Sequence, residues 1–346
     1  MDAVSRFGER LVILAHGGYP DNAKTMEGVM RYGDYDVAAV LAHTYAGSMT
    51  GEHFPELPSV PVLDTMTELD TPVDALLIGV APVGGGLDPR WRADIQTALA
   101  RGCDVISGLH TQLSDDAELA ELAVANDATI HELRKPPSDL PIAAGRAADV
   151  DATVVLTVGT DCSVGKMTTT MELVRAATDR GIDAGAVATG QTGIAITGRG
   201  IGIDRVPADF AAGAAEQLVI EAAESFELVI VEGQAAIVHP GFSPDTIALL
   251  HGATPDGLVL CHDATRESYR NFSSFSLPPV ERYVEWYTSL AEPIKPTRVI
   301  GGSIDTSAVE SDAAARDAMD DFSRRIDAPA TDVIRYGADV LVDQLV

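Results

Sequence analysis

The chain of 346 residues is long enough for two domains, and 46% of its residues are hydrophobic, which suffices for two well-filled cores. It carries 52 acidic against 24 basic residues, and this net charge of -28 argues against nucleic acid as a partner, because phosphate backbones need a basic surface. Only four of the basic residues are lysine. An acid-rich, lysine-poor surface predicts a protein that stays hydrated in concentrated salt, and therefore a halophilic source.

No segment of the sequence suggests contact with a membrane. An apolar run of about 18 residues, the length that spans a bilayer, does not occur. Residues 1–10 lack the apolar region of a signal peptide. We therefore expect a cytoplasmic protein with no membrane partner. The three cysteines, Cys103, Cys162 and Cys261, have no zinc-binding spacing.

The first half of the chain alternates short apolar runs with helical patterns. This alternation predicts a mostly parallel sheet with helices on both faces, and hence a Rossmann-like domain. Asp88 is the expected N-cap of the first helix, and Gly102 follows its end. The expected strands are residues 11–15, 37–41, 75–80, 104–107 and 129–133, and the expected helices are residues 88–100 and 115–126.

A proline-rich connector separates this half from the next. Pro136, Pro137 and Pro141 interrupt both helix and strand and favour an extended segment. We place the boundary after residue 146, so that residues 1–146 form the Rossmann-like domain and residues 147–346 a second α/β domain. In the second domain we expect strands at residues 153–158, 184–189, 228–231, 257–261 and 298–300, and helices at residues 166–180, 208–225, 313–326 and 338–346.

The most informative segment lies between the first strand and the first helix of the second half. Its glycines let backbone N–H groups converge on phosphate oxygens, and the following helix adds the partial positive charge of its N-terminus. Lys166 supplies a mobile cation for the outer phosphates. We therefore predict a phosphate-binding loop, or P-loop, for a nucleotide or coenzyme A. Its residues are Gly159, Thr160, Asp161, Cys162, Ser163, Val164, Gly165, Lys166, Met167, Thr168 and Thr169.

Two features of this loop depart from the common pattern. Five residues separate Gly159 from Gly165, where four are usual, and Met167 replaces the Ser or Thr that normally follows the lysine. A thioether is a poor ligand for Mg²⁺, which prefers oxygen. Thr168 or Thr169 would have to supply that oxygen, or the loop holds no tightly bound metal. The alternative is a glycine-rich turn that caps a helix and binds nothing.

The loop spacing resembles that of dethiobiotin synthetase and its amidotransferase relatives, which are P-loop enzymes of the ligase type. A second feature agrees with this resemblance. The apolar strand at residues 228–231 runs into Glu232 and Gly233, as in the second nucleotide motif of that superfamily. A carboxylate at the end of a parallel strand points into the ligand crevice, so Glu232 is a candidate to hold metal or water or to accept a proton.

Seven segments spread over nearly the whole chain form a recognisable set, at residues 79–86, 91–92, 108–110, 134–137, 159–169, 189–193 and 231–241. With these segments the chain resembles a family once known only as a domain of unknown function and now named for D-glutamate N-acetyltransferase. The resemblance implies a Rossmann-like N-terminal domain and a P-loop C-terminal domain. It also implies transfer of an acetyl group from acetyl-CoA to the amine of D-glutamate, with the P-loop holding the coenzyme phosphates.

Acetyl transfer requires a base that deprotonates the attacking ammonium, and Glu232 and His239 are the candidates for that role. His239 precedes Pro240 and Gly241, so a structural role in a turn is its alternative. For the acidic substrate we expect contacts from the stretch after residue 189. There, amide and hydroxyl groups come from Gln191 and Thr192, and the guanidinium groups that bind carboxylates come from Arg199 and Arg205.

Two other functions stay open on the sequence. An ATP-dependent carboxylate–amine ligase would bind ATP and Mg²⁺ in the same loop, with Thr168 as the metal ligand. A nucleotide-binding regulatory module would need only the loop and a partner surface. A small-molecule substrate is common to both enzyme hypotheses, and a symmetric homo-oligomer is compatible with each of the three.

Overall fold

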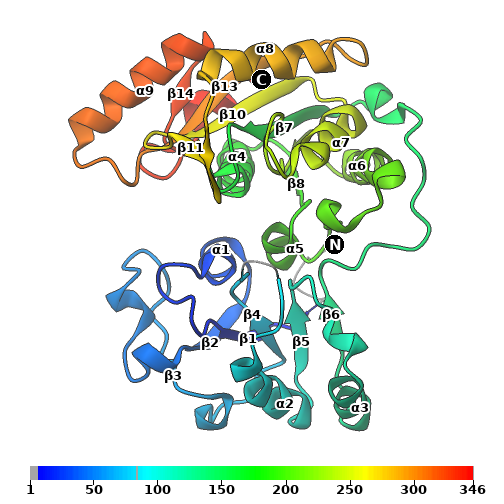
Figure 1. Ribbon diagram of the computed structural model, residues 1–346, viewed down its shortest axis with the longest axis vertical. Helices are drawn as coiled ribbons and strands as arrows, with labels where there is room; N and C mark the ends of the chain where they lie inside the picture. Colours follow the sequence, from blue (N-terminus) through cyan, green and yellow to red (C-terminus); the bar gives the residue numbers. More distant parts are fainter. Residues whose placement is uncertain (1–6, 83–84, 346) are drawn as a thin grey trace. The chain divides into compact units, whose positions relative to one another are not determined.

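The computed structural model describes residues 7–82 and 85–345 of the chain, which fold into two compact units (Figure 1). Each unit is built on its own six-stranded parallel sheet, which confirms the predicted fold class of two α/β domains. The first unit contains residues 1–136 and 190–202, and the second contains residues 137–189 and 203–346. The boundary expected after residue 146 stays a prediction. The return of residues 190–202 to the first unit is not indicated by any sequence pattern.

The first sheet has the strand order β3-β2-β1-β4-β5-β6, so the direction in which strands are added reverses between β1 and β4. Residues 11–14 of β1 are fully buried because helices cover both faces, which explains the uninterrupted apolar run. The strands are β1 (Arg10–Leu14), β2 (Asp36–Leu41), β3 (Val62–Leu63), β4 (Ala75–Ile78), β5 (Asp104–Ser107) and β6 (Ile130–Glu132).

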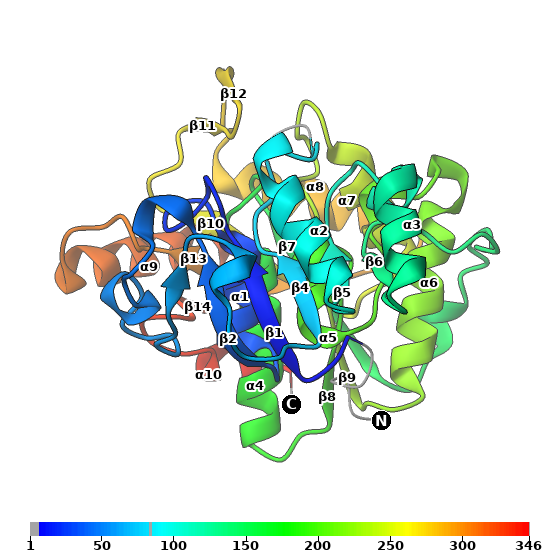
Figure 2. The same ribbon diagram turned by 90° about the horizontal axis from the view of Figure 1, so that it is seen from below.

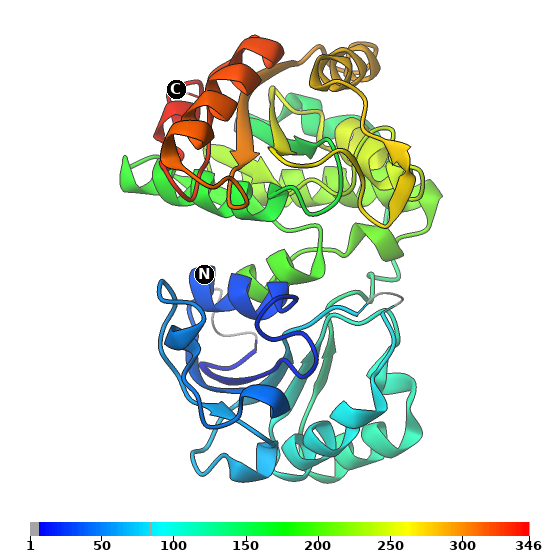
Figure 3. The same ribbon diagram turned by 60° about the vertical axis from the view of Figure 1, so that its left-hand side comes forward.

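Helix α5 (Gln191–Thr197) belongs to the first unit although its sequence lies in the second half of the chain. It lies beside α1 (Lys24–Tyr32), where Thr25 and Thr192 share a hydrogen bond of 2.8 Å and the Tyr35 hydroxyl donates to the Ala195 carbonyl (Figure 1). Its glycine and β-branched residues are weak helix formers, so packing on α1 sustains a helix that propensity does not predict. The face of the first sheet that lies opposite α1 and α5 carries α2 (Arg92–Ala100) and α3 (Ala117–Ala125) (Figure 3).

The second sheet has the order β14-β13-β10-β7-β9-β8, with β7 inside it. Buried side chains such as Leu156, Ile230 and Val259 form its core. Strand β10 and strand β13 extend beyond their predicted ends. The strands are β7 (Thr153–Gly159), β8 (Ala184–Val187), β9 (Leu228–Val231), β10 (Gly257–Asp263), β13 (Arg298–Asp305) and β14 (Ala330–Thr331).

Helices cover both faces of the second sheet, with α8 and α9 on one face and α4 on the other (Figures 1 and 3). A two-stranded hairpin of β11 (Ser268–Tyr269) and β12 (Phe272–Ser276) extends from this unit (Figure 2). Within the described ranges, no helix is both long and apolar enough to cross a membrane. The helices are α4 (Lys166–Asp179), α6 (Ala208–Ala223), α7 (Ser243–Ala253), α8 (Val280–Ala291), α9 (Asp312–Ile326) and α10 (Asp339–Val342).

Candidate phosphate-binding site

The predicted P-loop connects the end of β7 at Gly159 to the start of α4 at Lys166, the strand–loop–helix context that phosphate binding requires. Gly165 has φ +90°, a left-handed conformation that favours glycine, and it places the loop N–H groups at the start of a helix of 14 residues. The Lys166 ammonium donates to the Asp161 carbonyl over 2.7 Å, so its side chain folds back across the loop. These groups fit a phosphate.

The position after the lysine does not offer a ligand for magnesium. Met167 is 4% exposed and packs inward. The hydroxyl of Thr169 donates to the hydroxyl of Ser303 in β13 over 2.8 Å, so it is already engaged within the protein. The partly exposed Thr168 lies one residue beyond the position that usually binds the metal. The loop therefore fits phosphates better than it fits a magnesium–nucleotide complex, and Thr168 as a metal ligand stays a prediction.

Asp161 is a buried carboxylate inside the P-loop, and it joins the loop to the β11–β12 hairpin and to the segment before it. One oxygen accepts from the Arg266 guanidinium and from the Arg270 backbone N–H, each over 2.7 Å, and the other accepts from the Cys162 N–H. A buried negative charge needs such partners. This role was missed at the sequence level, although an acid inside a phosphate loop is a signal that a nearby cation must neutralise it.

Two side chains from other elements form hydrogen bonds to the start of the P-loop. The Tyr287 hydroxyl of α8 donates to the Gly159 carbonyl over 2.8 Å and accepts from Ile237, and burial raises the pKa of Tyr287. His262, at the end of β10, pairs its Nδ1 with the Thr160 hydroxyl over 2.9 Å. Burial lowers the pKa of His262 to about 4, so the ring is neutral near pH 7. Neither residue lies in a motif that sequence analysis singles out.

Glu232 directly follows β9, and the backbone of the next residue lies beside the P-loop. Its carboxylate is buried and accepts from the Thr189 N–H over 3.1 Å. The next residue, Gly233, passes so close to the loop that a Cβ there would lie 1.7 Å from the Thr157 carbonyl oxygen and 3.3 Å from Cδ of Lys166. The structure thus places the backbone after Glu232 against the stem of the P-loop lysine. Its function as a base stays a prediction.

His239 also lies at the loop and is buried. Its Nδ1 accepts from the N–H groups of Gly241 and Phe242, each over 3.1 Å, so the neutral ring carries its hydrogen on Nε2. This Nε2 lies 3.4 Å from a carboxylate oxygen of Asp161 and has no hydrogen-bond partner among the described residues. Burial lowers the pKa of His239. In this tautomer His239 is a donor, so the predicted role as base requires the other tautomer.

The four residues predicted to contact the substrate are divided between the two units. Gln191 belongs to the first unit, where its side-chain oxygen accepts from Arg134 over 2.7 Å. Thr192 is engaged with α1, and Arg199 is exposed in the same segment of the first unit. Arg205 is exposed in the second unit. Their substrate contacts stay predictions.

Comparison with known protein families supports both the Rossmann-like first domain and the P-loop second domain. Residues 43–136 match the family described as "Domain of unknown function (DUF1611_N) Rossmann-like domain", and residues 141–342 match "Domain of unknown function (DUF1611_C) P-loop domain". A crystal structure of a DUF1611 family protein from Anabaena variabilis has a TM-score of 0.92 and 34% identity, over 98% of this chain and 99% of that chain.

Two curated relatives carry the name D-glutamate N-acetyltransferase. The protein from Pseudoalteromonas sp is 37% identical over 270 residues, and the protein from Tritonibacter scottomollicae is 39% identical over 272 residues. Each alignment covers 78% of this chain and 80% of the relative. With its Rossmann-like and P-loop domains matched in this order, the chain belongs to the DUF1611 family, the family of the proteins named D-glutamate N-acetyltransferase.

Proposed function

We propose that this protein transfers the acetyl group of acetyl-CoA to the amine of an acidic amino acid of the D-glutamate type, with the P-loop holding the coenzyme phosphates. The observation that carries the proposal is the loop, which keeps Lys166 and a long helix start for phosphates while the buried Met167 replaces the magnesium-binding hydroxyl. A coenzyme whose phosphates serve only for binding suits that combination, whereas phosphoryl transfer depends on magnesium. The names of both curated relatives support the same reaction.

The reaction sets a requirement for proton removal. The thioester C–S bond breaks and an amide C–N bond forms, so the substrate ammonium loses one proton before attack and a second as the thiolate leaves. The thiolate takes up one proton, and one is released to solvent. We assign the second proton to Glu232, because its neighbour Gly233 lies against Lys166 of the P-loop. His239 is the alternative acceptor.

Release of free thiol from acetyl-CoA tests the proposal. The protein in concentrated salt is mixed with acetyl-CoA and either D-glutamate or L-glutamate, and thiol is followed with time. We expect release that depends on the amino acid. Glu232→Gln is expected to lower kcat about 100-fold with the fold intact, because general base catalysis contributes about that factor or more. Glu224→Gln, at the exposed residue that directly follows α6, is the matched control and is expected to leave kcat unchanged.

The same assay separates the alternatives. No thiol release from folded protein with either glutamate would contradict the acetyltransferase proposal for that substrate. Formation of ADP from ATP in the presence of an amino acid would support the ligase instead. Binding of coenzyme or nucleotide without turnover would support the regulatory module.

A further inference from the structure

A pair of histidines lies at the carboxyl edge of the first sheet, outside the site described above. His16 comes two residues after the end of β1, His43 two residues after the end of β2, and Asp64 directly after β3. The direction in which strands are added to this sheet reverses between β1 and β4. In open α/β sheets, ligands bind outside the carboxyl ends of the strands at such a reversal. The histidine pair therefore occupies the place where this fold puts a ligand.

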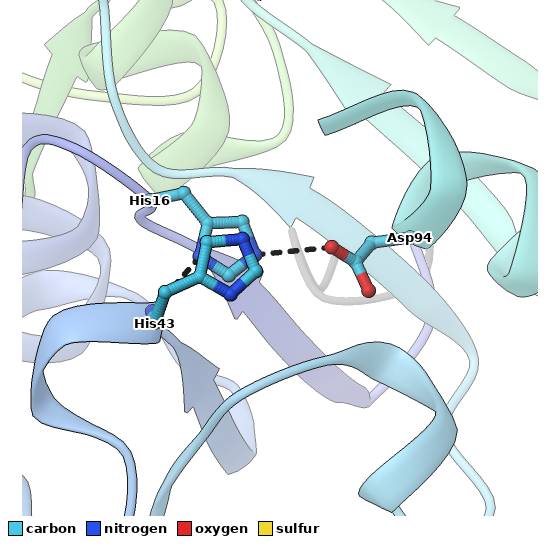
Figure 4. A group of neighbouring side chains, drawn as sticks. All are labelled: His16, His43 and Asp94. Atoms are coloured by element: carbon cyan, nitrogen blue, oxygen red, sulfur yellow. Dashed lines mark hydrogen bonds and ion pairs between the residues drawn. The ribbon is translucent and has the colours of Figure 1, made fainter. Parts of the chain in front are cut away.

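His16 is fixed in one tautomer by two hydrogen bonds. Its Nδ1 accepts from the backbone N–H of His43 over 3.2 Å, so its hydrogen is on Nε2 and points to Asp94 at 3.0 Å (Figure 4). The other oxygen of Asp94 accepts from the Met66 N–H over 2.6 Å. His16 and Asp94 are both buried. Because both ring nitrogens of His16 are already engaged, this residue serves as a support and not as the reactive group.

His43 is the accessible member of the pair. Its ring stacks on that of His16, with centroids 3.6 Å apart and 8° between the planes (Figure 4). Its Nδ1 lies 2.9 Å from a carboxylate oxygen of Asp64, which takes the hydrogen on that nitrogen and leaves the lone pair on Nε2. The His43 side chain is 43% exposed. A carboxylate that orients an imidazole in this way also stabilises the imidazolium that forms when Nε2 takes up a proton.

The geometry argues against a metal ion between these residues, although His16, His43 and Asp94 offer ligand atoms within 4.8 Å of one another. The lone pairs of imidazole lie in the ring plane, and the nearly parallel planes of two stacked rings, with centroids 3.6 Å apart and 8° between the planes, cannot both contain the same ion. A histidine that binds a metal also donates its other N–H to an acceptor. His16 instead accepts a backbone N–H at Nδ1. Proton transfer therefore fits this arrangement better than metal binding.

We propose that His43 is the proton acceptor of an amino-acid site in the first unit, where Nε2 takes the proton of the substrate ammonium and Asp64 positions the ring. The carboxylate partner is Arg90, whose guanidinium lies 3.6 Å from where a Cβ on Gly17 would be. Asp88 engages Nε and Nη2 of Arg90 and thereby fixes its orientation. This inference rests on the proposed function, because it names the site of the acidic amino acid used there.

The charges around His43 suit a zwitterion. Asp64 lies at the ring itself, Glu68 binds the Asp64 N–H, and Asp94 binds His16 beneath it. These carboxylates favour an ammonium group, whereas Arg90, whose Nε and Nη2 already donate to Asp88, binds a substrate carboxylate through its remaining N–H groups. The step moves one proton from the ammonium nitrogen to Nε2 and leaves a neutral amine, the form that attacks a thioester. The imidazolium then returns its proton to solvent, which accounts for the one proton released in the overall reaction.

The test uses the full-length protein and two readouts. His43→Gln is expected to lower kcat for thiol release about 100-fold while the Kd for acetyl-CoA is unchanged. Added imidazole is expected to restore part of the rate to His43→Gly, which keeps the backbone N–H that His16 needs. Asp64→Asn is expected to lower kcat less than His43→Gln does. His53→Gln, at another exposed histidine of the same unit, is the matched control and is expected to leave kcat unchanged.

The second readout does not depend on turnover. The NMR signal of the His43 ring, assigned by its loss in His43→Gln, is followed while D-glutamate is added without coenzyme. We expect a shift of this signal in the wild type and no comparable shift of the His53 signal. An unmoved His43 signal, or wild-type kcat in His43→Gln, would overturn the inference while leaving the proposed function intact. Absence of thiol release together with a shifted His43 signal would contradict the proposed function but keep the amino-acid site.

Discussion

The two sheets of this protein both present functional groups at the carboxyl ends of their strands, but in different ways. In the second unit the groups come mostly from one continuous loop, Gly159–Thr169, which connects β7 to α4. In the first unit His16, His43 and Asp64 come from the ends of three different strands. A site built from one loop leaves a motif in the sequence, whereas a site built from several strand ends leaves only single residues far apart.

The difference also concerns how each site is supported. The P-loop is fixed by backbone close approach, as at Gly233, and by buried partners such as Tyr287. The histidine pair is fixed by side-chain hydrogen bonds to Asp94 and Asp64, one buried and one half exposed. Substitutions should therefore damage the two sites by different mechanisms and to different degrees.

The largest effect is expected for Gly233→Ala. Its Cβ would lie 1.7 Å from a backbone oxygen of β7, which cannot move without displacing the strand beneath the P-loop. We expect the free energy of unfolding of the second unit to fall by about 3 kcal/mol or more, as in severe overpacking. Gly86→Ala in the first unit is the control, because nothing among the described residues lies within 4 Å of its Cβ. Equal stability of the two variants in urea unfolding would contradict this account.

Lys166→Ala is expected to have the next largest effect, on ligand binding and not on folding. Loss of a charged hydrogen-bond donor to phosphate should cost about 2–3 kcal/mol, which corresponds to a rise of roughly 30–150-fold in the Kd for coenzyme A. Titration calorimetry with coenzyme A measures this change. Lys295→Ala, which breaks an ion pair with Asp256 in the same unit, is the control and should leave the Kd unchanged. An unaltered Kd in Lys166→Ala would refute phosphate binding by the loop.

Asp94→Ala tests how the histidine pair is supported in the first unit. The substitution leaves the Nε2–H of His16 and the N–H of Met66 buried without an acceptor, so we expect the free energy of unfolding to fall by about 2 kcal/mol. Asp64→Ala removes the half-exposed carboxylate that binds His43, and the free energy of unfolding should fall by at most about 1 kcal/mol. If both variants lost the same stability, the division into a buried support and an accessible reactive ring would be wrong.

The contrast between the two units also explains what the sequence predicts well. Continuous apolar runs such as residues 11–14 form strands because both faces of each sheet are covered, and the P-loop follows from its own spacing. Helix α5 was not predicted, because its local residues disfavour a helix and only packing on α1 sustains it.

Predictions of the site divide in the same way. Glu232 directly follows β9, and His239 lies at the P-loop with its Nε2 3.4 Å from a carboxylate oxygen of Asp161, while the catalytic role of each stays a prediction. The partners of Asp161 could not be predicted, since Arg266 is 105 residues away in sequence and nothing in either segment indicates the other. The same applies to His43 and Asp94, which become neighbours of His16 only when the sheet forms.

The smallest expected effect is on the pH dependence of the free energy of unfolding. Two partly buried groups contribute to it in opposite directions, His262 next to the P-loop and Asp245 at the start of α7. Burial lowers the pKa of His262 to about 4, whereas it raises the pKa of Asp245 to about 6. Between the ordinary histidine value of 6.5 and pH 4, the unfolded chain binds a proton at residue 262 that the folded chain does not bind. The free energy of unfolding should therefore fall as the pH falls through this window.

For His262 we expect a loss of about 1 kcal/mol between pH 7 and pH 5.5. Asp245 acts in the opposite direction, because its folded state binds the extra proton, so its contribution is lost as the pH rises from 3.8 towards 6. Urea unfolding of wild type and His262→Gln at both pH values isolates the histidine, since the contribution of Asp245 cancels in the difference between the two proteins. A pH dependence that is the same in both proteins would mean that His262 is not held neutral by burial, and that its bond to Thr160 alone supports the loop.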